Sequence, residues 1–202
     1  MSQLYHDHHR RLQDKFDTRR LADRVEEVIV HDVITDEDKQ FIEARDMFFL
    51  STVNRDGEPT VSYKGGDPGF VKVVDEKTIA FPSYDGNGMY LSMGNMLGNG
   101  KVGMLFIDFE NPHRIRLHGK ASVSDDDELL KDYHEAELIV RVTVGNMFIN
   151  CPRYIHRFKK IEHSSFVPSK ACPTPVPEWK KLDVVQDVLP EKTRTAIERS
   201  EK

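Results

Sequence analysis

Between Asp46 and Val123 the chain alternates short, β-rich apolar runs with turn signals, and this spacing constrains the fold more than any other feature. The runs are 47–53, 60–64, 70–74, 78–81 and 102–107. Asp56-Gly57 has the composition of a tight hairpin turn between the first two. Val102–Ile107 is apolar on both faces, which predicts a buried central strand. Because helices are appended rather than placed between successive strands, the sequence predicts a mainly β fold, a small barrel.

Helical patterns occur on either side of these runs. Leu12–Val30 carries apolar residues at helical spacing, with a break expected near Asp17. Thr35 is followed by three acidic residues, so it should cap a helix over Asp36–Ala44. A similar acidic turn predicts a helix over Asp125–Glu135.

Three regions follow: an N-terminal helical segment at residues 1–45, the barrel domain at 46–165 and a proline-rich tail at 166–202. Late strands of the barrel are expected at Leu138–Val144 and Arg153–Ile161. The tail contains few large apolar residues. We therefore expect it to wrap a surface rather than form a core of its own.

The overall composition excludes several classes of protein. A formal net charge of −5 argues against a general nucleic-acid binder, which would show a broad basic surface. No apolar run is long enough to span a bilayer, and the first residues lack the apolar core of a signal peptide, so we expect a cytoplasmic protein without membrane contact. Cys151 and Cys172 are then expected as reduced thiols.

One polar pair lies within the second run. Side chains alternate along a strand, so Ser62 and Lys64 share one face while Val61 and Tyr63 share the other. A hydroxyl beside an ammonium can bind a phosphate, and the three glycines of the loop Gly65–Gly69 would let a ligand approach the backbone. The residues alone leave an ordinary solvated strand face as the alternative.

A short helix is expected to open at Asp85-Gly86-Asn87-Gly88. Its apolar stripe, predicted to pack on the barrel, is Met89, Met93, Met96 and Leu97. Ser92 and Asn95 fall on another face. Because the first turn of a helix offers unpaired N–H groups, this start could hold an anion, with Asn87 as an added donor. Asp85 or Asn87 acting only as a cap is the alternative.

Basic residues line one face of a further strand: Arg114, Arg116, His118 and Lys120. These residues could form a solvated strand face or a ligand site. Arginine is suited to a ligand site because it binds phosphate and stacks on a flat heteroaromatic ring. Arg153 and Arg157 are candidates for the same reason. By contrast, the cluster His6-Asp7-His8-His9 predicts no metal site, since no second cluster supplies the remaining ligands. No catalytic constellation can be inferred from residue order.

Five ordered segments carry a resemblance to a known family: Pro59–Val71, Ala80–Asn87, Gly94–Asn99, Val102–Asp108 and Arg114–Gly119. Together they resemble the pyridoxamine 5'-phosphate oxidase-like family of FMN-binding split β-barrels, which are usually homodimers with the flavin at the subunit interface. The resemblance implies FMN contacts from Val61, Ser62, Tyr63, Lys64, Pro82, Ser83, Gly86, Asn87, Arg114 and Arg157. Arg157 would reach the flavin across the dimer.

The chain departs from the true pyridoxamine 5'-phosphate oxidases at two places. It has Gly86-Asn87-Gly88 where they have Ser-Arg-Lys, and it lacks their C-terminal Arg-x-His. The prediction is therefore a related FMN-dependent oxidoreductase acting on a small molecule. Two alternatives stay open: a non-catalytic module that binds flavin, haem or deazaflavin, and a cofactor-free interaction domain on the same scaffold.

Overall fold

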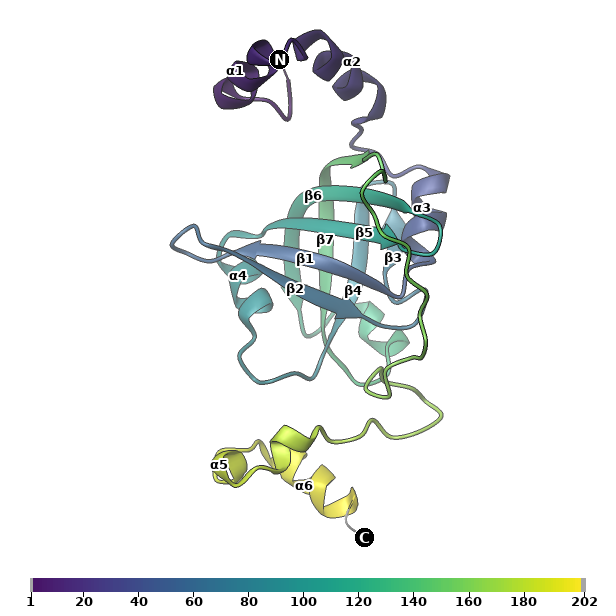
Figure 1. Ribbon diagram of the computed structural model, residues 1–202. Helices are drawn as coiled ribbons and strands as arrows, with labels where there is room; N and C mark the ends of the chain where they lie inside the picture. Colours follow the sequence, from purple (N-terminus) through teal and green to yellow (C-terminus); the bar gives the residue numbers. More distant parts are fainter. Residues whose placement is uncertain (1, 201–202) are drawn as a thin grey trace. The chain divides into compact units, whose positions relative to one another are not determined.

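The computed structural model describes residues 2–200, which form two compact units, the first ending at Lys159 and the second beginning at Lys160 (Figure 1). One antiparallel sheet of seven strands dominates the first unit, in the order β2-β1-β5-β6-β7-β4-β3. Its strands are β1 Met47–Val53, β2 Pro59–Gly65, β3 Lys72–Asp75, β4 Thr78–Tyr84, β5 Lys101–Asp108, β6 His113–Ser124 and β7 Ala136–Ile149. The predicted mainly β fold is confirmed.

Helices accompany the sheet without alternating with its strands. The first unit contains α1 Asp7–Lys15, α2 Arg19–Ile29, α3 Asp36–Glu43, α4 Leu91–Asn99 and the 3-10 helix η1 Glu128–Asp132. The second contains η2 Glu178–Lys181, α5 Asp183–Gln186 and α6 Glu191–Ser200. Among residues 2–200, no helix combines the length and apolar character needed to cross a membrane.

The sheet curls over so that its separate parts share one core. The ring of Phe48 on β1 lies 5.0 Å from that of Phe81 on β4, 5.3 Å from Phe106 on β5 and 5.8 Å from Phe70, with distances taken between ring centroids. Figure 1 shows β1 and β2 crossing over β4 in this arrangement. Phe48, Phe81 and Phe106 are fully buried, and burying one such side chain contributes about 1.5–3 kcal/mol. The inner face of the curled sheet is therefore the core.

Several helix signals read from the sequence are confirmed. The Thr35 Oγ1 accepts a hydrogen bond from the Asp38 N–H at 3.2 Å, and the Asp38 carboxylate accepts one from the Thr35 N–H at 3.0 Å. This reciprocal cap fixes the start of α3. The expected break between α1 and α2 occurs at Asp17, whose φ is 53°.

Other expectations are wrong in position or type. Asp125–Glu135 forms only the short η1, because the chain returns to the core at Tyr133 and starts β7 at Ala136. Arg153–Ile161 is not a strand: β7 already pairs with β6 and β4, which leaves no edge beside it. Leu138–Val144 is the middle of the longer β7.

The tail forms a separate compact unit. Residues 160–200 contain three short helices, and Leu189 and Thr193 are buried among them. That the tail wraps a surface rather than forming a core of its own stays a prediction. Cys151 and Cys172 are free and exposed.

Candidate functional site

The inner face of the edge strand β2 carries polar groups where a core strand would carry apolar ones. Ser62 and Lys64 lie opposite Leu50 and Phe48 of β1, and both of these neighbours are fully buried. Side chains opposite one another in a sheet share a face. Ser62 and Lys64 therefore point inward, as their alternation with Val61 and Tyr63 predicts.

Helix α4 is fastened against this polar face. The Ser62 and Ser92 hydroxyls are hydrogen-bonded, with their Oγ atoms 3.1 Å apart. Asn95 Nδ2 donates to Thr52 Oγ1 at 3.0 Å, and Thr52 is buried. The structure thus brings together two predicted site residues, Ser62 and Ser92. It uses Asn95 to hold the helix on β1.

Lys64 is the group whose surroundings most need an explanation. Its side chain is half-buried, and it makes no hydrogen bond or ion pair with any residue from 2 to 200. Burial lowers the pKa of its ammonium, since desolvation disfavours the charged form. A buried cation without a counter-charge is costly, and a bound anion would remove that cost.

The start of α4 lies further along the chain than the sequence suggests. The helix begins at Leu91, and its N-cap is Tyr90 in a left-handed conformation with no capping side chain. The first-turn N–H groups, with Ser92 among them, therefore keep their capacity to bind an anion. Asn87 lies before the helix and is not its cap. Its Oδ1 accepts from the Met89 N–H at 3.1 Å.

The expected apolar stripe of this helix is only half correct. Met93 and Met96 are buried against the barrel, whereas Met89 precedes the helix and Leu97 is 70% exposed. The other residues predicted to hold the phosphate lie in two different places. Pro82 is buried and Ser83 half-buried on β4, while Gly86 and Asn87 are exposed in the loop.

The two arginine candidates have different settings in the structure. Arg114 points to the outer face of β6, because its neighbour Ile115 is buried in the core, and β1 and β5 separate β6 from β2. Arg114 Nη2 donates to the Cys151 carbonyl at 2.9 Å, while its Nε is buried with no partner in the described chain. Arg157 Nε donates to the Glu110 carbonyl at 3.0 Å.

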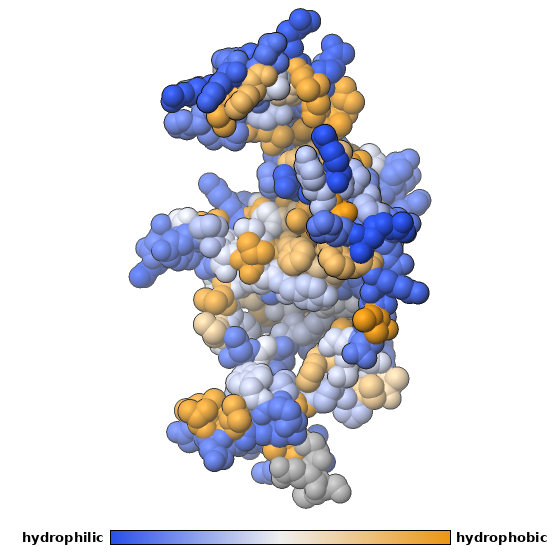
Figure 2. All heavy atoms as spheres, viewed as in Figure 1, coloured by the Kyte–Doolittle hydropathy of each residue, from blue (hydrophilic) through white to orange (hydrophobic). Residues whose placement is uncertain are grey.

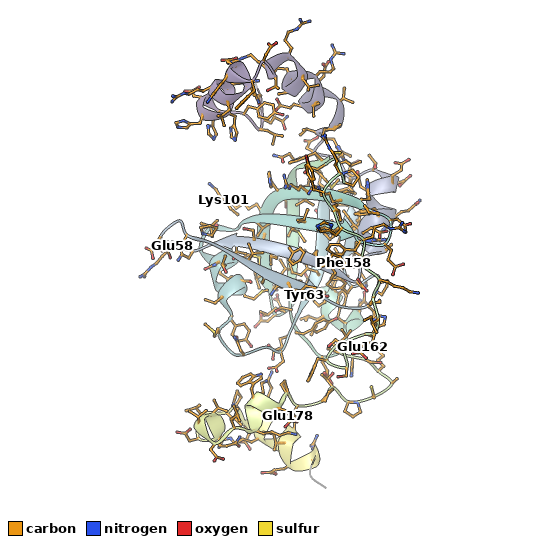
Figure 3. The ribbon with its side chains drawn as sticks, in the orientation of Figure 1. Glu58, Tyr63, Lys101, Phe158, Glu162 and Glu178 are labelled. Atoms are coloured by element: carbon orange, nitrogen blue, oxygen red, sulfur yellow. The ribbon has the colours of Figure 1, made fainter. Side chains whose placement is uncertain are left out.

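Reasoning from the sequence missed an outer apolar face, formed by Phe49, Val61, Tyr63, Leu105 and Ile107. Val61 and Tyr63 are 66% and 62% exposed, and the Phe49 and Tyr63 rings meet edge to face. Figure 2 shows hydrophobic residues over the middle strands of this side, and Figure 3 places Tyr63 on β2. The signal was present in Val102–Ile107, whose second apolar face is half-exposed rather than covered by the fold.

The family comparison covers the region that contains these features. A family model described as pyridoxamine 5'-phosphate oxidase matches residues 34–146, more than half of the chain. The chain belongs to the pyridoxamine 5'-phosphate oxidase family. This confirms the resemblance carried by the five sequence segments, and the split barrel of the family is the curled sheet described above.

Several solved structures resemble this family member. HupZ of Group A Streptococcus is 20% identical, with 57% of this chain and 93% of that one covered and a TM-score of 0.47. An FMN-binding protein from Syntrophomonas wolfei is 13% identical, with coverages of 69% and 97% and a TM-score of 0.46. HutZ, the heme storage protein from Vibrio cholerae, is 18% identical, with coverages of 57% and 94% and a TM-score of 0.43. No curated protein matches the sequence.

The histidine rings near the N-terminus lie close to one another. The His6 ring lies 3.9 Å from that of His9 and 5.6 Å from that of His8. Across residues 2–200 there is no group of three or more His, Cys, Asp or Glu side chains arranged to hold a metal ion.

Proposed function

We propose that this protein binds FMN and uses it as an oxidoreductase on a small molecule. The observation that supports this most is Lys64, an inward-facing, half-buried ammonium without a partner in residues 2–200. It lies on the strand where the family resemblance expects contact with the flavin. A dianionic phosphate or the electron-rich part of a flavin supplies the negative charge that Lys64 lacks.

The neighbouring groups suit the rest of such a ligand. Ser62 and Ser92 provide hydroxyls beside Lys64, and the uncapped start of α4 provides main-chain N–H donors. Ser83 adds a half-buried hydroxyl on β4. Gly86 and Asn87 are exposed in the loop before α4, where the family resemblance expects the phosphate.

FMN supplies the redox chemistry in such a protein, because its ring accepts and returns a hydride. The residues of the chain have other tasks. Lys64 would hold a positive charge toward the bound flavin, and the curled sheet would shield one side of that group from water. Because the chain departs from the true pyridoxamine 5'-phosphate oxidases at Gly86-Asn87-Gly88, we propose a substrate other than theirs.

We also propose that the protein acts as a homodimer through its outer apolar face. Stable dimers bury about 800 Å² per subunit with aromatic residues at the centre, and Phe49 and Tyr63 are the aromatic residues of this face. Arg114 lies on the sheet face opposite to Lys64 of its own chain, and Arg157 donates to the Glu110 carbonyl. In a dimer they would serve the flavin of the partner subunit.

The experiment that tests the proposal is measurement of flavin content and turnover on purified protein. We expect a yellow protein whose bound FMN bleaches with a reductant and is reoxidised with steady turnover. A colourless protein that does not bind added FMN would refute the proposal. Bound FMN without turnover by any acceptor would instead identify a flavin-binding module.

A further inference from the structure

A cavity lies on the outer side of the sheet, away from Lys64. Its volume is about 510 Å³, and it is lined by residues 118–122 of β6 and 143–146 of β7. Sites for small molecules typically measure roughly 300–1,000 Å³. The cavity is therefore large enough for a small metabolite.

A bulge between the two strands shapes this cavity. His118 pairs with Asn146 and Gly119 with Val144, so Gly145 has no residue opposite it. A Cβ at Gly119 would lie 2.5 Å from the Thr143 carbonyl oxygen, which means that this approach of the strands requires glycine. Bulges of this kind redirect side chains and are frequent next to binding sites.

Two kinds of polar group belong to the lining of this cavity. Asn146 Oδ1 is buried and has no hydrogen-bond partner in the described chain, a situation that a native structure rarely tolerates without a ligand or water. His118 and Lys120 are exposed at the rim, and the lining contains no Asp or Glu. The cavity thus combines an ammonium and an imidazole at its rim with one buried acceptor that needs a donor.

We infer that this cavity binds a small phosphorylated metabolite carrying a free hydroxyl. The phosphate lies against Lys120 and His118, and the hydroxyl donates to Asn146 Oδ1. The site is distinct from the proposed flavin site, because Lys64 faces the inner side of β2 and this cavity lies on the outer side of β6 and β7.

Calorimetric titration of the purified full-length protein with glycerol 3-phosphate tests the inference. We expect saturable binding of one ligand per chain that Lys120→Gln and Asn146→Leu each weaken by about tenfold or more. Lys101→Gln is the matched control, since Lys101 lies opposite Lys120 in the sheet but does not line the cavity. It should change affinity by less than about twofold.

Two further titrations separate the contributions of phosphate and hydroxyl. Inorganic phosphate should bind more weakly and with an affinity that Asn146→Leu does not change, and glycerol should not bind. Lys64→Met should keep the affinity for glycerol 3-phosphate even where it loses FMN, which separates this inference from the proposed function. Absence of saturable binding would overturn it, as would equal weakening by Lys101→Gln and Lys120→Gln.

Discussion

Replacing Lys64 by methionine should separate ligand binding from fold stability. Methionine keeps a long, flexible apolar side chain and removes the ammonium. If that ammonium makes a charge-assisted hydrogen bond to FMN, its loss costs about 1.5–3 kcal/mol of binding free energy. This corresponds to an affinity about 10- to 150-fold weaker.

The same substitution should not destabilise the ligand-free protein. Wild-type Lys64 is half-buried without a partner in the described residues, so removing its charge removes a desolvation cost. We expect the ligand-free Lys64→Met variant to unfold at the same temperature as wild type or higher. Added FMN should raise that temperature in wild type much more than in the variant, because ligand stabilisation follows affinity.

The pH dependence has a defined sign. The folded-state pKa of Lys64 lies below its unfolded value, so between the two values the unfolded chain holds more protons. The free energy of unfolding of the ligand-free protein therefore rises with pH through that window, and the cost of the charge is complete below it. FMN affinity should fall as the pH rises above the folded-state pKa, because the anion favours the ammonium form. Both trends should be absent in Lys64→Met.

Fluorescence titration of FMN and thermal denaturation, each across pH, measure these effects. Lys101→Met is the matched control, since Lys101 is an exposed lysine at the start of β5 (Figure 3). Wild-type FMN affinity in Lys64→Met would refute the site. A ligand-free Lys64→Met protein that unfolds well below wild type would refute the reading of Lys64 as an unpaired buried charge.

Three other predictions follow from particular contacts. Tyr63→Glu, which places a charge on the outer apolar face, should give a monomer in sedimentation experiments, whereas the equally exposed Leu97→Glu should not; a Tyr63→Glu dimer would exclude this face. Chains carrying Lys64→Met or Arg114→Ala should each lose flavin when expressed alone. If Arg114 serves the flavin of the partner subunit, a heterodimer of the two variants should regain one intact site. A heterodimer without bound flavin would show that Arg114 does not serve the partner. Thr35→Ala should lower the free energy of unfolding by about 1 kcal/mol, because the α3 cap is lost. Urea denaturation measures this change, with Thr60→Ala as the control. An unchanged free energy of unfolding would show that Asp38 and His31 hold this turn alone.

The short-range features of the fold were readable from the residues themselves. Thr35 caps α3, Asp56-Gly57 lies in the turn between β1 and β2, and Ser62 alternates with Val61 on opposite faces. Each of these depends on hydrogen bonds or side-chain directions within a few residues. Such interactions are encoded locally, and no distant contact overrides them here.

Only the tertiary structure decided which distant groups meet. The Ser62 hydroxyl is hydrogen-bonded to the Ser92 hydroxyl, thirty positions away in the sequence, because α4 packs on the curled sheet. The helix does not start at Asn87. Arg114 resembles a flavin contact in sequence, yet it lies on the face opposite Lys64. Arg153–Ile161 has a strand-like pattern but forms no strand, because β7, the strand before it, is already paired on both sides with β6 and β4. A strand needs another strand to pair with, and a binding site needs side chains that converge on one place. Both conditions depend on how the whole sheet closes.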